Sequence, residues 1–243
     1  MLPVLFRIGS LEITSFGVLV ALGALAGLWV FRRELARSRL PDAAVDAAIY
    51  GLVGGLLGAK LLYVFEHLDE GTFLGLLFDR GGMSWFGGFA GGIAAGYATI
   101  RAKGWPVLAV LAAATPALAV GQLLGRIGCF LVGDDYGHPT TLPWGVAFPQ
   151  GLPPTVERVH PTQIYEAIFL ALFTWVLIRW RRAGVPDRAV LGRYFIGVGA
   201  FRFALEFVRV NTRVLGPLTV AHLFALAVTA LGLVVLMWPA RRS

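Results

Sequence analysis

Seven apolar segments, each about as long as a membrane-crossing helix, limit what this chain can fold into more than any other feature. A helix needs about 20 mostly apolar residues to cross the hydrocarbon. Hydrophobic residues make up 57% of the chain and charged residues only 14%, which leaves too little polar surface for a soluble globule. We therefore predict an all-α integral membrane protein, a single polytopic domain over residues 1–243. Its seven transmembrane helices are predicted at residues 13–31, 43–65, 84–100, 107–125, 161–178, 190–208 and 219–238.

Basic residues are concentrated in alternate connections between these segments. They follow the first, third, fifth and seventh segments, as Arg33, Arg101, Arg181 and Arg241 do. Because cytoplasmic loops are enriched in Lys and Arg, the N-terminus is predicted outside and the C-terminus in the cytoplasm. The net charge of +7 comes from these short clusters, so it indicates contact with a lipid bilayer and not with nucleic acid. The connection at about residues 126–160 is then a long external loop, a length typical of binding elements.

The sequence RIGCFLVGDDYG, from Arg126 to Gly137, places an arginine and two carboxylates among glycines after a long apolar run. Charged groups near the hydrocarbon are costly unless they face a cavity, a partner or a charged ligand. We therefore interpret Arg126 as a ligand-binding residue, and the glycines as positions where a lipid-sized ligand approaches the backbone. The alternative is a salt bridge from Arg126 to Asp134 or Asp135 at the membrane interface.

A second polar group lies on the sixth segment. Arg202, Glu206 and Arg209 are spaced i, i+4 and i+7, so they are expected to share one face of an otherwise apolar helix. A glutamate that holds a guanidinium in place, with paired donors left for phosphate oxygens, forms a phosphate clamp. The alternative is a buried ion pair that only fixes the register of this helix against another.

A third polar group, HPTQIYE at residues 160–166, opens the fifth segment. Proline suits the first helical turn, so His160 is predicted at or near the N-cap. His160 is then either a general base or headgroup donor, or a cap for free backbone N–H groups. His138, beside the glycine-rich motif, is a second candidate base.

Glycines recur every four residues in the second and third segments. Gly51 with Gly55 and Gly54 with Gly58 are examples, and such faces let neighbouring helices pack closely. The stretch GGMSWFGG at residues 81–88 is interpreted differently. Its paired glycines are expected to expose backbone N–H groups to an anionic headgroup at a helix start.

These motifs together resemble the bacterial prolipoprotein diacylglyceryl transferases. The resemblance rests on GRIG at residues 125–128, on the GDDYG and HPTQIYE sequences, and on GAFR with EFVR at residues 199–209, and it extends over nearly the whole chain. It implies transfer of the diacylglyceryl group of phosphatidylglycerol to the lipobox cysteine of a preprolipoprotein, with release of glycerol phosphate. The implied partners are phosphatidylglycerol and preprolipoprotein signal peptides, and the implied location is the bacterial cytoplasmic (inner) membrane, with the site near the external face. No metal or other cofactor is expected.

The resemblance also implies roles for individual residues. Arg126 and Arg202 would bind and stabilise the phosphate, and Glu206 would orient Arg202. Gly137 would permit close approach of the headgroup. His160 and His138 complete the candidate catalytic set. The candidate substrate-binding residues are Gly137, Asp134, Arg209, Gly87, Gly88, Gln163 and Tyr165.

The chain departs from the family pattern at several hydrogen-bonding positions. Phe86 stands where the family has histidine, Cys129 and Val132 replace asparagines, and Phe16 replaces tyrosine. Three hypotheses follow: a transferase in which a candidate histidine or the arginine field replaces the missing histidine, a paralogue with another acceptor, and a non-catalytic lipid-binding or transport protein. Cys129 itself is either a thiol nucleophile or a small, nearly apolar substitute for asparagine.

Overall fold

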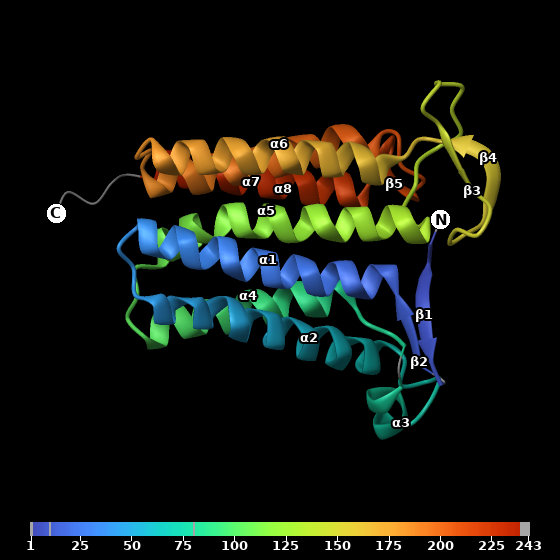
Figure 1. Ribbon diagram of the computed structural model, residues 1–243, viewed down its shortest axis with the longest axis horizontal. Coiled ribbons are helices and arrows are strands. Elements are labelled where there is room, and N and C mark those ends of the chain that lie inside the picture. The colour runs from blue at the N-terminus through green and yellow to red at the C-terminus, as the bar shows by residue number, and fades with distance from the viewer. Residues whose placement is uncertain (1, 10, 80, 239–243) are drawn as a thin grey trace. The chain divides into compact units, whose positions relative to one another are not determined.

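The computed structural model describes residues 2–9, 11–79 and 81–238, and the chain is mostly helical (Figure 1). Its α-helices are α1 (Ser15–Arg37), α2 (Asp46–Glu66), α3 (Phe73–Phe78), α4 (Trp85–Ala102), α5 (Val107–Val132), α6 (Thr162–Arg182), α7 (Asp187–Glu206) and α8 (Val220–Met237). A 3-10 turn, Asp42–Val45, leads into α2. Three short antiparallel hairpins, which the sequence pattern did not predict, are β1–β2 (Val4–Ile8, Leu11–Thr14), β3–β4 (Val146–Phe148, Thr155–Val159) and β5–β6 (Arg213–Leu215, Leu218–Thr219).

Each of the seven predicted segments forms a long helix, and among the described residues five are long and apolar enough to cross a membrane. These five are α1, α2 with its preceding turn, α5, α6 and α8. The fold class is thus confirmed as a mostly helical protein with several candidate spans. The two other long helices are α4, which is rich in glycine, and α7, which carries Arg202 and Glu206.

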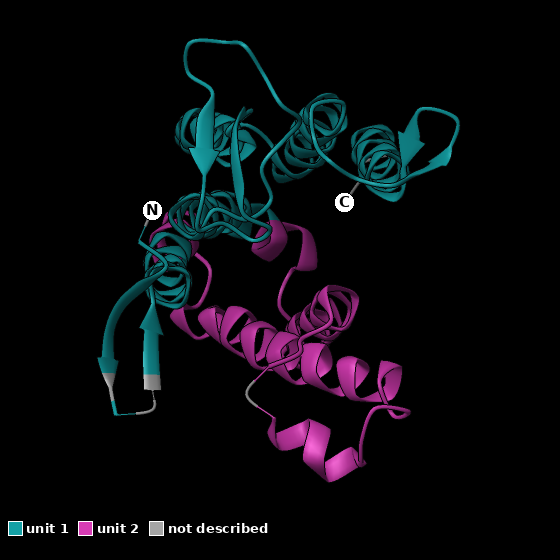
Figure 2. Cartoon of the chain, turned by 90° about the vertical axis from the view of Figure 1, so that its right-hand side faces the viewer, with its two compact units in different colours: residues 1–31, 112–243 teal, residues 32–111 magenta. Residues whose placement is uncertain are grey.

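The chain divides into two compact units, coloured separately in Figure 2. Residues 1–31 and 112–243 form unit 1, and residues 32–111 form unit 2. In unit 1, helices α5, α6 and α7 share a buried apolar cluster that includes Leu170, Leu177 and Tyr194. Helices α7 and α8 pack closely where Gly192 faces Gly232, because a side chain at either glycine would meet the opposite backbone. The candidate site lies entirely within unit 1.

Unit 2 is built on the contact between α2 and α4. A Cβ atom at Gly58 would overlap the carbonyl oxygen of Gly87, and one at Gly91 would overlap that of Gly54. The expectation that glycine faces bring these helices together is therefore confirmed.

Among the helix ends that differ from the predicted boundaries, two change where site residues lie. Helix α5 continues to Val132 and not to residue 125, because the residues after Arg126 remain apolar and the first helix-terminating glycine is Gly133, with φ of 78°. Arg126 therefore belongs to the last turns of a helix and not to a loop. Helix α7 ends at Glu206, so Arg209 follows the helix instead of continuing its face.

Candidate active site

Arg126 projects from the last turns of α5 and is paired with two carboxylates. Its Nη1 lies 2.8 Å from Oδ2 of Asp135, and its Nε lies 2.9 Å from Oε2 of Glu166 on α6. Asp135 has a positive φ of 62°, a conformation that aspartate tolerates better than most side chains, and it directly follows the turn that ends α5. The predicted alternative, a salt bridge from Arg126 to the paired aspartates, is thus present, and it involves Asp135.

Arg202 and Arg209 share the buried carboxylate of Glu206. Nη2 of Arg202 lies 2.9 Å from Oε2 of Glu206, and Nε of Arg209 lies 3.7 Å from the same oxygen. Although α7 ends at Glu206, the turn after it returns the Arg209 guanidinium to that carboxylate. Nη2 of Arg209 also lies 2.7 Å from Oδ1 of Asp135.

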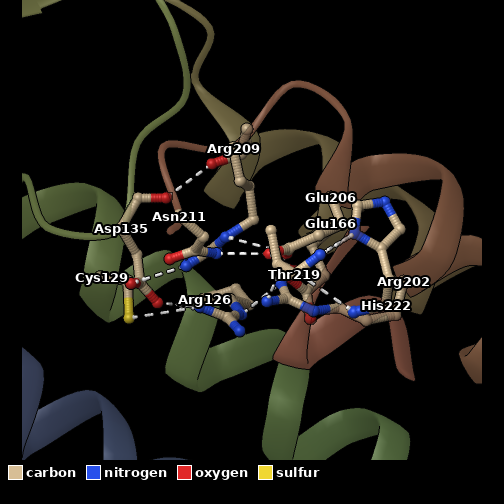
Figure 3. A network of polar contacts seen from close by, with 11 residues as sticks. Arg126, Cys129, Asp135, Glu166, Arg202, Glu206, Arg209, Asn211, Thr219 and His222 are labelled. Carbon is tan, nitrogen blue, oxygen red and sulfur yellow. Dashed lines mark hydrogen bonds and ion pairs between the residues drawn. The ribbon is translucent and has the colours of Figure 1, made fainter. Parts of the chain in front are cut away.

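The ion pairs close into a ring of three arginines and three carboxylates (Figure 3). Asp135 bridges Arg126 and Arg209, and Glu206 bridges Arg209 and Arg202. Glu166 completes the ring, because its Oε2 contacts Arg126 and lies 3.9 Å from Nη1 of Arg202. We call this set, Arg126, Asp135, Arg209, Glu206, Arg202 and Glu166, the arginine–carboxylate ring. The three predicted arginines therefore converge from α5, α7 and the turn after α7.

The ring retains donors for a further anion. Nη1 of Arg202 and Nη1 of Arg209 are buried and have no hydrogen-bond acceptor among the described residues. A buried N–H group without an acceptor costs free energy, and an anionic ligand that accepts from these groups would recover it. The formal charges of the ring cancel, so an anion that binds there must use these free donors or displace ring carboxylates from the guanidinium groups.

The two neighbouring aspartates differ in their electrostatic environment. Burial raises the pKa of Asp134 above its ordinary value. Burial would also raise the pKa of Asp135, but the charges of Arg209 and Arg126 outweigh it and hold that pKa below its ordinary value. Asp135 is thus the carboxylate that is fixed in its charged form.

The start of α6 fixes the backbone of this loop. The Thr162 hydroxyl donates to the carbonyl oxygen of Asp135 at 2.7 Å, and the Gln163 amide donates to that of Asp134. Both side chains are fully buried. Gln163 was predicted to bind substrate, and its observed amide contact supports the chain that carries Asp135.

Gly137 lies where three segments meet. Its N–H donates to the carbonyl of His160 at 2.9 Å, and the next N–H, of His138, donates to that of Val208 at 2.8 Å. A Cβ atom at Gly137 would overlap the carbonyl oxygen of Val208 and crowd Thr162. Close packing therefore requires glycine at this position. Approach of a headgroup to Gly137 stays a prediction.

His160 precedes helix α6, whose N-cap position is held by Pro161 without a side-chain cap. The Nδ1 atom of His160 lies 3.2 Å from the hydroxyl of Tyr165, and the two possible roles of its side chain, base and cap, stay predictions. That hydroxyl also accepts a hydrogen bond from Nε1 of Trp144 at 2.8 Å. His160 is partly buried, whereas His138 is exposed.

Glu206 is also held on the side away from the arginines. Its Oε1 accepts hydrogen bonds from Asn211 at 2.6 Å and from the Thr219 hydroxyl at 2.7 Å. Thr219 and the buried His222 form a capping box at the start of α8. His222 packs against Phe203 and Phe207 and also joins this polar network through Thr219.

The other predicted binding residues belong to unit 2. Gly87 and Gly88 lie on the face of α4 that packs against α2, where a Cβ at Gly87 would overlap the backbone of Gly58. Helix packing requires glycine at position 87, whereas a Cβ at Gly88 would make ordinary contacts at 3.4 and 3.5 Å. Contact of either glycine with a headgroup stays a prediction. Phe86, which the resemblance predicts to replace a histidine, is exposed.

One group of donor atoms has spacing compatible with a metal ion. Cys129, Asp134 and Asp135 present atoms within 4.8 Å of one another. However, both oxygens of Asp135 are already paired with guanidinium groups, and a nearby arginine disfavours a cation. Cys129 is buried, as expected of a small apolar substitute for asparagine.

Sequence reasoning missed several members of this site. The sequence analysis includes Glu166 only as the last residue of the HPTQIYE motif and predicts no role for it. Asn211 and Thr219 had no predicted role either. A glutamate one turn inside an apolar helix is itself a signal, because an acid at that depth needs a partner. Asn211 and Thr219 carry no such signal, because polar residues are ordinary in a connection between helices.

Comparison with known proteins identifies the family. The family model described as prolipoprotein diacylglyceryl transferase matches residues 3–238. The chain belongs to this family. A phosphatidylglycerol–prolipoprotein diacylglyceryl transferase from Clostridium tetani is 37% identical over 220 residues, which cover 88% of this chain and 87% of that protein. Proteins of the same name from Methylococcus capsulatus and Geobacter sulfurreducens are 36% and 35% identical and cover 99% of this chain.

The arginine–carboxylate ring is therefore the central polar feature of a diacylglyceryl transferase family member. Four of the ring's six members, Arg126, Arg202, Glu206 and Arg209, were predicted from the family motifs.

Proposed function

We propose that the protein transfers the diacylglyceryl group of phosphatidylglycerol to the lipobox cysteine of preprolipoproteins. The observation that carries this proposal is the arginine–carboxylate ring, whose Arg202 and Arg209 retain buried N–H groups for a phosphate. Family membership and the names of the relatives favour this first hypothesis over a different acceptor and over a purely lipid-binding protein.

In the reaction, the acceptor sulfur bonds to the glycerol carbon that carries the phosphate. The carbon–oxygen bond breaks and its electron pair leaves with glycerol phosphate, so the phosphate gains one negative charge. The thiol proton passes to a base. Donors already aimed at the developing charge lower the barrier, because they need no reorganisation as the reaction proceeds. Arg126, Arg202 and Arg209 supply these donors, and the ring carboxylates hold them in place.

The proton acceptor is the second part of the proposal. A thiol with pKa near 8.5 must lose its proton to become a good nucleophile. We propose His160 as the first candidate base and His138 as the second, because contact with Tyr165 orients the His160 ring whereas His138 is exposed. The proposed substrate-binding residues remain Gly137, Asp134, Arg209, Gly87, Gly88, Gln163 and Tyr165.

We further propose seven membrane crossings in the bacterial cytoplasmic membrane, with the N-terminus outside and the ring near the external face. Seven long helices and the alternation of basic connections support this orientation. In a protein whose Cys129 is replaced by serine, a cysteine at the 84% exposed Val156 should react with an impermeant thiol reagent added to intact cells. A cysteine at Gly184 should not react. The reverse pattern would refute the external site.

The decisive experiment uses purified protein, phosphatidylglycerol and a synthetic lipobox peptide. We expect a peptide carrying a thioether-linked diacylglyceryl group, together with stoichiometric glycerol phosphate. A peptide with serine in place of cysteine is the matched control and should stay unmodified. Binding of phosphatidylglycerol without any transfer would replace this proposal by the lipid-binding hypothesis.

A further inference from the structure

The start of α8 contacts the arginine–carboxylate ring through Glu206. The Glu206 side chain is completely buried, and its two oxygens face different partners. Oε2 faces Arg202 and Arg209, whereas Oε1 accepts hydrogen bonds from Asn211 and Thr219. The contacts to Oε1 therefore determine how Oε2 is presented to the guanidinium groups (Figure 3).

His222 determines where the hydroxyl hydrogen of Thr219 points. The backbone N–H of Thr219 donates to Nδ1 of His222 at 3.1 Å, so that nitrogen is an acceptor and its lone pair is occupied. The Thr219 hydroxyl is 3.2 Å from the same nitrogen but only 2.7 Å from the charged oxygen of Glu206. The hydroxyl hydrogen therefore lies on the Glu206 side, where the acceptor is charged and closer.

Thr219 also has an ordinary role as the N-cap of α8. Its hydroxyl oxygen accepts the His222 backbone N–H at 3.3 Å. This contact is longer than the one to Glu206, and a cap alone requires no buried carboxylate opposite it. The hydroxyl thus serves two partners, accepting from the helix and donating to the ring.

We propose that Thr219, held by His222, is a positioning residue that orients Glu206 and through it the guanidinium groups of Arg202 and Arg209. The inference rests on the proposed transferase function. It assigns a part in that function to the N-cap of α8, a helix that contributes no charged residue to the ring.

The main test replaces Thr219 by valine, which keeps the shape and removes the hydroxyl. A hydrogen bond to a charged group contributes about 1.5–3 kcal/mol, so kcat/KM for phosphatidylglycerol should fall about 10- to 100-fold, with weaker binding of this lipid as part of the loss. Thr219→Ser should keep most activity. Thr72→Val, which removes the threonine cap of α3 in unit 2, is the matched control and should change kcat/KM less than twofold.

A double-mutant cycle with Glu206→Gln separates positioning from capping. If Thr219 acts through Glu206, the double variant should be no slower than Glu206→Gln alone. Multiplied effects, or Thr219→Val within threefold of wild type, would overturn the proposal. If valine prevents folding, Thr219→Gly removes the hydroxyl at a smaller cost to the cap and should show the same non-additivity.

A second readout keeps this test separate from that of the reaction. Binding of phosphatidylglycerol to the same variants in detergent is measured alongside transfer. Absence of transfer in the wild type would refute the proposed function. In that case, weaker phosphatidylglycerol binding by Thr219→Val, non-additive with Glu206→Gln, still supports positioning, and unchanged binding refutes it.

Discussion

Replacing Arg202 by lysine tests whether the fork of the guanidinium, and not only its charge, matters. In the structure, Nη2 of Arg202 is engaged with Glu206 at 2.9 Å. Nη1 is buried without a hydrogen-bond acceptor among the described residues and lies 3.9 Å from Glu166. Lysine has a single nitrogen. If that nitrogen satisfies Glu206, nothing remains in the position of Nη1.

The expected magnitude follows from the hydrogen bond that lysine cannot make. Arg202→Lys removes one donor to the phosphate, and a hydrogen bond to a charged group contributes about 1.5–3 kcal/mol. At about 1.4 kcal/mol for each factor of ten, kcat should fall about 10- to 150-fold. Arg202→Ala removes every guanidinium donor of this residue, so kcat should fall further than in Arg202→Lys. It also leaves the buried Glu206 without one of its partners, which should lower the free energy of unfolding by about 3–5 kcal/mol.

The assay is transfer from phosphatidylglycerol to a lipobox peptide, with kcat and KM determined separately. The matched control is Arg182→Lys, at the exposed end of α6, which should leave both constants unchanged. Arg181 is less suitable because it is buried and paired with Asp187. If kcat of Arg202→Lys stays within threefold of the wild type, the paired donors of the guanidinium are not needed, because the charge alone suffices.

The remaining predictions concern stability and the proton acceptor. Asp135 has a lowered pKa in the folded protein, so its charged form stabilises the fold above the ordinary aspartate pKa of about 3.9, and that stability is lost as pH falls through the folded pKa. Asp135→Asn should therefore lower the unfolding temperature at pH 7, and this loss should shrink as the solution becomes acid. The raised pKa of Asp134 has the opposite sign, so Asp134→Asn should raise the unfolding temperature at pH 7, with the gain absent in acid. Gly58→Ala should lower the free energy of unfolding by about 1–3 kcal/mol in a denaturant titration, because the new Cβ overlaps the backbone of α4. Gly51→Ala should be tolerated, because its Cβ would lie 3.4 Å from the carbonyl oxygen of Gly92. His160→Ala should lower the transfer rate about 10²-fold near neutral pH if His160 is the base, and an unchanged rate would exclude it.

The sequence by itself determined the membrane class, the positions of seven long helices and the residue types of the site. Apolar length is a local property that survives folding, so segments such as 107–125 were predictable. Arginine within an apolar context was equally readable, because a charge at that depth requires a partner. The sequence also offered Asp134 or Asp135 as a salt-bridge partner of Arg126, and the structure shows the pair with Asp135.

Only the tertiary structure decided how these charges are connected. The pairing of Glu166 with Arg126 joins α6 to α5, and the contact of Arg209 with Asp135 joins the turn after α7 to the turn after α5. Spacing along one helix predicts neighbours three or four residues apart and says nothing about partners on another helix. Thr219 shows the same limit, because its role depends on a buried carboxylate that only the packing of α7 against α8 brings within 2.7 Å.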